Sequence, residues 1–255
     1  MNKTALITGA SAGLGKAFAA ALAAKGHDLV LVARREDRLN ELANELRSQQ
    51  GVSVTVIAMD LGELDAAQNI FSRTESLGLC IDILVNNAGY GLTGKFISQP
   101  LGTYQKFLQV MVTSVVSLSR LYLEGMVDRG YGRIINVSSV ASFLPGSSGN
   151  NLYTGAKSLL NSFSETLHKE VKHNGVHVTA ICPGFTRTEF HDQEGFQKAK
   201  QNIPNFMWSE AEGVVQTAID ANEKGTMIVI PGRFNRFLAF MLRTIPHSLL
   251  TKLLA

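Results

Sequence analysis

The sequence has few of the residues on which disulfide-bonded or metal-binding proteins depend. Only two of its 255 residues are cysteines, Cys80 and Cys182, and they have neither C-x-x-C spacing nor nearby histidine partners. This pattern excludes a disulfide framework, and because no cluster of histidines, cysteines and carboxylates stands out, we expect no metal site. We interpret both cysteines as small buried hydrophobic residues in a reducing compartment.

The excess of positive over negative charge is also small. The formal net charge is +3 and the lysines and arginines are scattered along the chain, so nucleic acid is not an expected partner. Met1 leads almost directly into an apolar strand pattern, which leaves no room for a signal or transit peptide. Together with the cysteine content, this pattern predicts a cytoplasmic protein.

Linkers, low-complexity runs and short internal repeats are missing as well. With 255 residues, of which 45% are hydrophobic and 18% are charged, the chain can bury a large core. Because nothing divides the sequence in two, we expect residues 1–255 to form a single domain.

A glycine-rich turn follows the first apolar run. Residues 3–7 have a strand pattern, residues 8–15 are Thr-Gly-Ala-Ser-Ala-Gly-Leu-Gly, and a helical pattern follows. Such a turn lets a pyrophosphate approach the backbone at the positive end of the helix dipole. We therefore predict a dinucleotide site, although the spacing differs from G-x-G-x-x-G. The expected contacts are Gly9, Ser11, Gly13, Leu14 and Gly15.

Two arginines follow the second predicted strand, residues 27–33. In a Rossmann unit this position meets the adenosine ribose, where a carboxylate accepts from a 2′-hydroxyl and an arginine accommodates a 2′-phosphate. Because Arg34 and Arg35 follow this strand directly and no acidic residue separates them from it before Glu36, we predict a preference for NADPH over NADH. The alternative is that both arginines only solvate the start of a helix.

Two further strand ends carry candidate cofactor contacts. The third predicted strand, residues 53–58, precedes Asp60 and Leu61, and the Asp60 carboxylate could accept from the adenine amino group or cap a helix. The fourth strand, residues 81–85, runs into Asn-Asn-Ala-Gly at residues 86–89, whose small residues and amides suit a wall beside a cofactor. The residues assigned to this wall are Asn87, Ala88 and Gly89.

The alternation of strand and helix patterns along the chain predicts the architecture. Apolar strand patterns recur between amphipathic helical patterns, an order typical of a parallel sheet with helices on both faces. We therefore expect an α/β fold, namely a Rossmann-like doubly wound parallel sheet of about seven strands.

A tyrosine and a lysine form the most informative pair. In Tyr153-Thr154-Gly155-Ala156-Lys157, helical spacing places the phenol and the ammonium on one face. A nearby cation favours the phenolate and lowers the tyrosine pKa from about 10, so the pair can move protons near neutral pH. The alternative is a solvated lysine beside a half-buried ring.

Five ordered motifs resemble the classical short-chain dehydrogenase/reductase family. They span nearly the whole chain and are Thr8-Gly9-x-x-x-Gly13-x-Gly15, Asn86-Asn87-Ala88-Gly89, Asn136-Val137-Ser138-Ser139, Tyr153-x-x-x-Lys157 and Pro183-Gly184. The resemblance implies a Rossmann-fold oxidoreductase that moves a hydride between a nicotinamide and a carbonyl or alcohol. It also implies a homodimer or homotetramer.

The resemblance implies roles for single residues. Tyr153 is similar to the family's catalytic acid and base, and Lys157 to the residue that holds the nicotinamide ribose and lowers the tyrosine pKa. Ser139 matches the serine that binds the substrate carbonyl, with Ser138 as its close rival. The segment from Pro183-Gly184 onward resembles the one that covers the nicotinamide. Candidates for bonding the carboxamide are Thr186 and Thr188, whose alternative role is helix capping.

One member of the family's usual set is missing. The predicted long helix from about Thr103 to Arg129 normally carries an asparagine that kinks it and anchors a relay water, and Met111 stands at that position. A methionine cannot hold such a water, so either a backbone carbonyl, Thr113 or Ser114 replaces it, or turnover is impaired. We predict an NADPH-dependent carbonyl reductase; the alternative is a catalytically weak NADP(H)-binding sensor or scaffold.

The last part of the chain indicates how the substrate is bound. Residues 185–208 are long for a connector and rich in aromatics, so we interpret them as a lid over an apolar pocket for lipophilic ketones, steroids or acyl chains. A capping box at residues 209–212 opens the next helix, and residues 227–230 form a last strand. The amphipathic tail, residues 233–255, packs on the domain or a partner subunit, with docking on a membrane surface as the lesser alternative.

Overall fold

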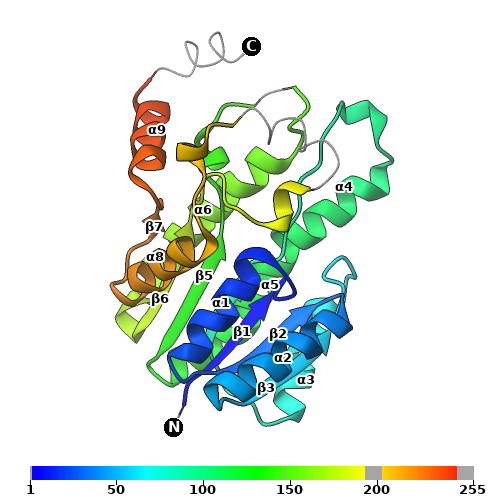
Figure 1. The fold of residues 1–255 in the computed structure, drawn as a ribbon, viewed down its shortest axis with the longest axis vertical. Helices are drawn as coiled ribbons and strands as arrows, with labels where there is room; N and C mark the ends of the chain where they lie inside the picture. Colours follow the sequence, from blue (N-terminus) through cyan, green and yellow to red (C-terminus); the bar gives the residue numbers. More distant parts are fainter. Residues whose placement is uncertain (1, 147, 193–202, 246–255) are drawn as a thin grey trace.

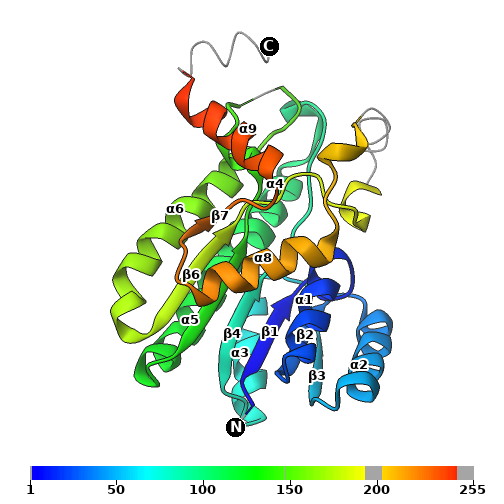
Figure 2. The same cartoon turned by 60° about the vertical axis from the view of Figure 1, so that its left-hand side comes forward.

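The computed structural model describes residues 2–146, 148–192 and 203–245, which contain one seven-stranded parallel sheet (Figure 1). Its order, β3-β2-β1-β4-β5-β6-β7, confirms the predicted doubly wound, Rossmann-like fold. Figure 2 shows the short β7 at one end of the sheet, next to β6 and α8. The strands are β1 Thr4–Thr8, β2 Asp28–Ala33, β3 Val54–Ala58, β4 Ile81–Asn86, β5 Gly132–Val137, β6 Val176–Ile181 and β7 Ile228–Val229.

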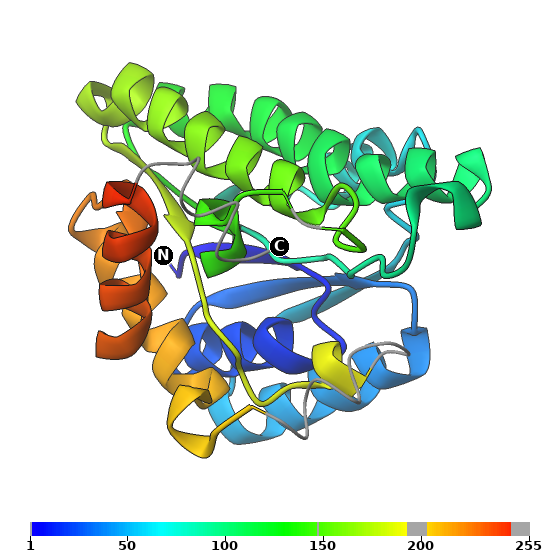
Figure 3. The same cartoon turned by 90° about the horizontal axis from the view of Figure 1, so that it is seen from above.

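Helices cover both faces of the sheet (Figure 3). In β1, Ala5 and Ile7 belong to one buried cluster and Leu6 belongs to the other, so both faces of the strand are apolar and buried. The first face packs against α1 Gly13–Ala24, α2 Glu36–Gln50 and α8 Ala211–Glu223, and the second against α3 Ala66–Ser76, α5 Ser114–Asp128 and α6 Tyr153–Val171. Short 3-10 helices are η1 Phe96–Ser98, η3 Val140–Phe143, η4 Lys172–Asn174, η5 Glu189–Asp192 and η6 Asn205–Met207.

The helix predicted over residues 103–129 contains a π-helical segment. α4, Leu101–Leu108, passes into η2, Gln109–Thr113, which passes directly into α5. A π segment is a wider turn within an α-helical course and often lies at a functional site. By length and composition residues 101–128 could cross a membrane; in this fold Leu118 and Met126 of the same helix are fully buried against the sheet.

The strand order places the candidate site at the carboxyl ends of β1 and β4. β1 pairs with β2 on one side and with β4 on the other, so the chain order reverses there. Open α/β sheets bind ligands in the crevice at such a switch point. Thr8 ends β1 and Asn86 ends β4, so the glycine turn and the Asn-Asn-Ala-Gly segment both begin at this crevice.

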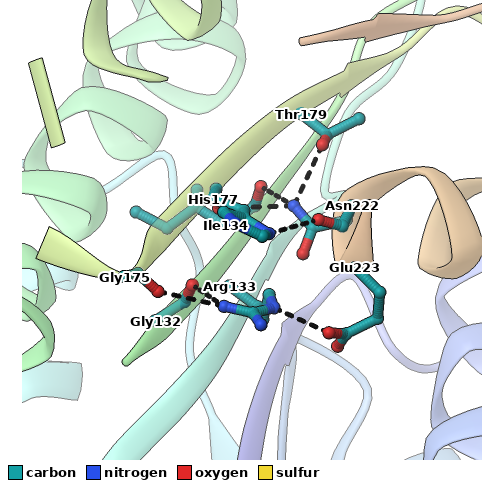
Figure 4. Close-up of polar contacts among 8 residues, drawn as sticks. All are labelled: Gly132, Arg133, Ile134, Gly175, His177, Thr179, Asn222 and Glu223. Atoms are coloured by element: carbon teal, nitrogen blue, oxygen red, sulfur yellow. Dashed lines mark hydrogen bonds and ion pairs between the residues drawn. The ribbon is translucent and has the colours of Figure 1, made fainter. Parts of the chain in front are cut away.

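One asparagine fixes α8 to the sheet (Figure 4). The Asn222 side-chain amide donates to the backbone oxygens of Ile134 and His177 and to Thr179 Oγ1, at 3.0, 3.3 and 3.0 Å. The Asn222 backbone oxygen in turn lies 2.8 Å from His177 Nδ1. These bonds join α8 to β5 and β6, so they fix the position of α8 on the sheet.

The helix cap predicted for α8 does not form. The expected capping box at residues 209–212 required Ser209 to bond the first turn of the helix. Instead, Ser209 forms an isolated bridge with Thr186, and its N–H donates to Phe185 O at 2.9 Å. Helix α8 begins at Ala211 without a side-chain cap. Ser209 therefore anchors the loop after β6.

The cysteines and the last strand also differ in part from expectation. Cys182 is buried directly after β6, as predicted, but Cys80 is exposed because it lies in the turn before β4. Burial raises the pKa of the Cys182 thiol to about 11, which keeps it protonated at neutral pH. The strand expected over residues 227–230 is limited to the two residues of β7.

Helix α9, Arg233–Thr244, follows β7 and is packed on one side only. Asn235 and Ala239 are buried, whereas Phe237 and Phe240 are each 62% exposed. The predicted packing of the tail on its own domain therefore holds for one face of this helix. For the other face, a partner subunit or a membrane surface stays a prediction, and residues 246–255 lie outside the described part of the chain.

A buried histidine makes the stability of the fold depend on pH. His168 of α6 is 6% exposed, and its Nδ1 accepts the backbone N–H of Val178 at 3.2 Å. Burial, and then the neighbouring His177, lowers the pKa of His168 from its ordinary 6.5. Below that pH the unfolded chain binds a proton that the native protein does not bind. The free energy of unfolding therefore decreases as the pH falls from about 7 to about 5.

We expect His168→Asn, whose amide oxygen can still accept from Val178, to flatten this pH dependence. Urea unfolding at several pH values measures it, and the exposed His173→Asn is the control that keeps the wild-type slope. His27, whose pKa burial also lowers, accounts for the dependence that remains. Equal slopes for His168→Asn and the wild type would contradict the role given to His168.

Candidate active site

The turn after β1 is built from glycine because its neighbours leave no room for side chains. A Cβ on Gly15 would lie 2.2 Å from Gly9 O and 2.6 Å from Asn87 Nδ2. Gly9 and Gly13 have φ angles of 66° and 52°, which disfavour other residues. Close packing within the protein therefore requires these glycines, and the predicted approach of a pyrophosphate is a second reason for them. The turn directs the N-terminus of α1 into the crevice, which fits an anion.

Asn87 joins the end of β4 to the glycine turn. Its side-chain amide donates to Thr8 O at 2.9 Å and to Gly9 O at 3.2 Å. The backbone N–H groups of Asn87 and Ala88 both donate to Thr8 Oγ1, at 3.0 and 3.1 Å. The structure thus brings the predicted cofactor wall beside the predicted phosphate turn.

Met111 of η2 lies against the same wall. A Cβ on Gly89 would approach Met111 Sδ to 2.9 Å, so a larger residue here would displace the methionine side chain. Met111 is 1% exposed and forms a buried cluster with Phe107 and Ala156, against which Tyr153 packs. The methionine therefore fills the space between α6 and the Asn-Asn-Ala-Gly segment with an apolar side chain.

The predicted phosphate-binding arginines lie at the end of β2. Both are exposed, and Arg35 Nη2 donates to Ser11 Oγ of the glycine turn at 3.1 Å. A cavity of about 240 Å³ is lined by Ser11, Lys16 and Arg38 and also by three carboxylates, those of Glu41, Glu45 and Glu189. Arg38 was not predicted. Its position one helical turn after Arg35 is the sequence signal that could have identified it.

A carboxylate from a distant segment pairs with these arginines. Glu189 of η5 contacts Arg38 Nη1 through Oε1 at 3.1 Å and Oε2 at 2.9 Å. Glu189 Oε2 also lies 3.5 Å from Arg35 Nη1. The segment after β6 is therefore attached to the start of α2 through charge.

Three predicted cofactor contacts have their side chains engaged within the protein. Asp60 Oδ1 accepts from the N–H of Gly62, and Oδ2 accepts from Lys106 Nζ, both at 2.9 Å. The Asp60 carboxylate thus orders the loop after β3, and the alternative of a helix cap is wrong because α3 begins further along the chain. Leu61 is 6% exposed and Leu14 packs against the first core cluster, so both side chains support the core.

Tyr153, Lys157 and Ser139 come together after β5. Tyr153 is the first residue of α6, and Lys157, one turn later, has Nζ 5.7 Å from the centre of the tyrosine ring. Lys157 is buried, and its Nζ donates to Val137 O at 2.7 Å. The Ser139 side chain lies close enough to the Tyr153 phenol to affect its pKa, and Ser139 Oγ accepts the N–H of Ala141 at 3.1 Å. The three predicted side chains therefore share one site.

Buried hydrogen bonds fix this site and distinguish the two serines. Ser138, the rival of Ser139, is buried and its Oγ donates to Lys157 O at 2.9 Å. Its hydroxyl is thus used to hold α6 on β5. Asn161 Nδ2 donates to Ser142 Oγ at 2.7 Å and attaches η3, the helix capped by Ser139, to α6. The distance between the serine and the tyrosine is therefore set by the scaffold.

Burial dominates the proton affinities at this site. It raises the pKa of Tyr153 to about 12, and the hydrogen bond with Ser139 offsets only part of that increase. Burial also lowers the pKa of Lys157 to about 8, opposed to a smaller extent by Cys182. The direction expected for Tyr153 from the sequence is therefore wrong: the phenol is desolvated, and the ammonium is bonded to Val137. A phenol with this pKa stays protonated at neutral pH.

The segment after β6 lies over the glycine turn. The Thr188 side chain comes within 3.1 Å of a Cβ built on Gly13. Thr186 Oγ1 donates to Gly184 O at 3.1 Å, and Thr188 Oγ1 donates to Thr186 O at 3.4 Å. Both hydroxyls therefore bond the loop's own backbone in this structure.

The predicted lid is described only in part, because residues 193–202 lie outside the described chain. The ring of Phe190 is 6.2 Å from that of Tyr153, and the rings of Phe185 and Trp208 are 5.6 Å apart. An aromatic ring therefore lies near Tyr153, and the apolar pocket expected from the sequence stays a prediction.

Comparison with known proteins agrees with this geometry. A model of the short chain dehydrogenase family matches residues 3–199. The chain is 34% identical to the very-long-chain 3-oxoacyl-CoA reductase of Mus musculus over 223 residues, which are 86% of this chain and 68% of the mouse protein. A short-chain dehydrogenase from Sphingobium yanoikuyae in complex with NADPH has a TM-score of 0.83 at 30% identity, covering 96% of this chain and 97% of that one. A 7beta-hydroxysteroid dehydrogenase has a TM-score of 0.87 at 27% identity, covering 99% and 96%. This chain therefore belongs to the short chain dehydrogenase family and is an oxidoreductase.

Proposed function

We propose that this protein is an NADPH-dependent reductase of bulky, lipophilic carbonyl compounds. The observation that supports it most is the grouping of Tyr153, Lys157 and Ser139 after β5, two strands from the glycine turn at β1. This separation lets one end of a dinucleotide lie on the turn while the other reaches the tyrosine. When bound, the reduced nicotinamide supplies the hydride.

The residues of the crevice fit this cofactor at three places. The turn from Gly9 to Gly15 directs backbone N–H groups at a pyrophosphate. Arg34 and Arg35 offer cations to a 2′-phosphate at the end of β2. Ala88, whose N–H bonds Thr8, and Gly89, which faces Met111, have small side chains or none between these groups and the tyrosine.

Each catalytic side chain has its own task in this proposal. The Tyr153 phenol, which is protonated at neutral pH, donates a proton to the carbonyl oxygen. The Ser139 hydroxyl donates a hydrogen bond to the same oxygen and stabilises the negative charge that develops there. Lys157, held by Val137 O, orients the nicotinamide ribose.

The surroundings of Tyr153 favour an apolar substrate. Tyr90, Leu92 and Leu152 pack with Tyr153 against the cluster around Met111. Among the similar proteins, one is named as a reductase of very-long-chain 3-oxoacyl-CoA and another as a 7beta-hydroxysteroid dehydrogenase. We infer that 3-oxoacyl thioesters and steroid-sized ketones are the substrate classes to test first.

The second candidate function, an NADP(H)-binding sensor with little turnover, rests on Met111. One predicted substitute for the missing asparagine is occupied, because the buried Ser114 Oγ donates to Val110 O at 2.8 Å. The intact set of Ser139, Tyr153 and Lys157 favours the reductase.

A substrate panel separates the two functions. We expect oxidation of NADPH, followed by its absorbance, with turnover on the order of 1 to 10 per second for the best lipophilic ketone or 3-oxoacyl thioester. A protein that binds NADPH and oxidises none of it across lipophilic ketones, diketones and acyl thioesters would support the sensor.

Cofactor preference is tested by replacing both predicted phosphate-binding arginines. We expect Arg34→Asp with Arg35→Ala to raise the KM for NADPH about 10- to 100-fold, because charge-assisted hydrogen bonds are worth about 1.5–3 kcal/mol. The KM for NADH should change far less. Arg120→Ala, which removes an exposed arginine paired with Glu124 on α5, is the control. Unchanged values for both cofactors would mean that the 2′-phosphate binds elsewhere.

A further inference from the structure

We propose that Glu189 sets the strength of NADPH selectivity by competing with the cofactor's 2′-phosphate for Arg35 and Arg38. The inference rests on the proposed NADPH preference and adds two residues to it. Arg38 becomes a second phosphate-recognising arginine, and Glu189 becomes an internal competitor for the same pair.

Three segments meet at this cluster. Arg35 follows β2, Arg38 lies in the first turn of α2, and Glu189 begins η5, the helix after the Pro-Gly loop. The carboxylate bonds Arg38 Nη1 with both oxygens, at 3.1 and 2.9 Å, and reaches Arg35 Nη1 at 3.5 Å. Arg35 Nη2 also donates to Ser11 Oγ at 3.1 Å, so the cluster lies beside the glycine turn.

A carboxylate held between two guanidinium groups takes the place that a phosphate would take. Guanidinium groups bind carboxylates and phosphates through the same donors, and a doubly charged phosphate attracts them more strongly. The side chains of Glu189, Arg35 and Arg38 are 55%, 45% and 43% exposed, so water and salt screen the pairs. Each pair is therefore weak enough for a phosphate to displace it.

The residue before Glu189 lies against the glycine turn. Thr188, directly before Glu189, lies within 3.1 Å of a Cβ built on Gly13. A ligand that carries a 2′-phosphate breaks the ion pairs of Glu189 and pairs with both arginines in its place. A ligand with a free 2′-hydroxyl has no charge to replace the carboxylate. Removing the charge of Glu189 should therefore favour the phosphorylated ligand alone.

Calorimetric titration of the full chain with 2′,5′-ADP and with 5′-AMP tests the proposal. We expect Glu189→Gln to bind 2′,5′-ADP about fivefold more tightly than the wild type, with 5′-AMP changed less than twofold. The gain should shrink as salt is raised from about 50 to about 500 mM, because the pairs are exposed. Arg38→Ala should weaken 2′,5′-ADP and leave 5′-AMP unchanged.

Glu210→Gln is the matched control, because Glu210 forms an exposed pair with Arg187 at 3.0 Å at the far end of the same loop. It should bind both nucleotides as the wild type does. An unchanged affinity of Glu189→Gln for 2′,5′-ADP, or an equal gain for both nucleotides, would overturn the proposal. A wild type that binds both nucleotides equally would instead contradict the proposed NADPH preference. The two proposals therefore fail on different results.

Discussion

Tyr153→Phe is expected to lower kcat about a thousandfold while the protein still binds NADPH. The substitution removes one oxygen, and with it the proton that the proposed mechanism delivers to the carbonyl oxygen. General acid catalysis contributes about 10²- to 10⁴-fold, and the proposed mechanism assigns the proton transfer to this phenol. Steady-state oxidation of NADPH gives kcat, and nucleotide titration gives the affinity.

Tyr131→Phe provides the control for this loss. Tyr131 precedes β5 at the opposite end of the sheet, where Lys3 and Arg133 lie over its ring, and the ring is kept in phenylalanine. Its kcat should equal that of the wild type. Wild-type turnover in Tyr153→Phe would remove the tyrosine from the mechanism, and with it the proposed roles of Ser139 and Lys157.

The second large effect is expected from Gly15→Ala. A methyl group at this position would lie 2.2 Å from Gly9 O and 2.7 Å from Gly9 C, distances that real Cβ atoms do not reach. The backbone of the turn must move, which should lower the free energy of unfolding by about 1–3 kcal/mol. Because the moved atoms form the predicted phosphate turn, we also expect nucleotide binding to be lost in titration.

Gly213→Ala separates the steric effect from the change of residue type. Gly213 lies in α8 with nothing within 4 Å of an added Cβ. Alanine is favoured over glycine inside a helix, so this variant should gain about 0.5–1 kcal/mol and bind nucleotide normally. A Gly15→Ala protein that unfolds and binds like the wild type would show that the turn has more room than the structure gives it.

The sequence predicts the sheet because each strand leaves a local signature. An apolar run such as that of β1 is buried on both faces by alternation, and the glycine turn directly follows it, so a few adjacent residues contain the pattern. The pairing of Tyr153 and Lys157 is local for the same reason, since one helical turn separates them. Features of this kind need no knowledge of distant segments.

The remaining features depend on contacts between distant segments. Glu189 and Arg38 are 151 positions apart, and no spacing rule connects them. The pKa of Tyr153 reflects how deeply the folded chain buries the phenol, so a rule based on the neighbouring lysine gave the wrong direction. The capping box did not form because the backbone of Ser209 pairs with Thr186, at the other end of the segment after β6, and the helix begins after it. Local propensity was overridden by tertiary structure in each case.

The π-helical segment has a consequence for protein engineering. A π turn accommodates one residue more than an α turn, so η2 has the form of a single-codon insertion into an ordinary helix. Because the wider turn takes up the extra residue, deleting one residue from 109–113 should return the segment to regular α-helix and leave the buried faces of α4 and α5 in place. Phe107 would then stay in the core and Leu108 would stay exposed. Chimeras that exchange α4 with a relative lacking the extra residue therefore need their alignment gap inside η2.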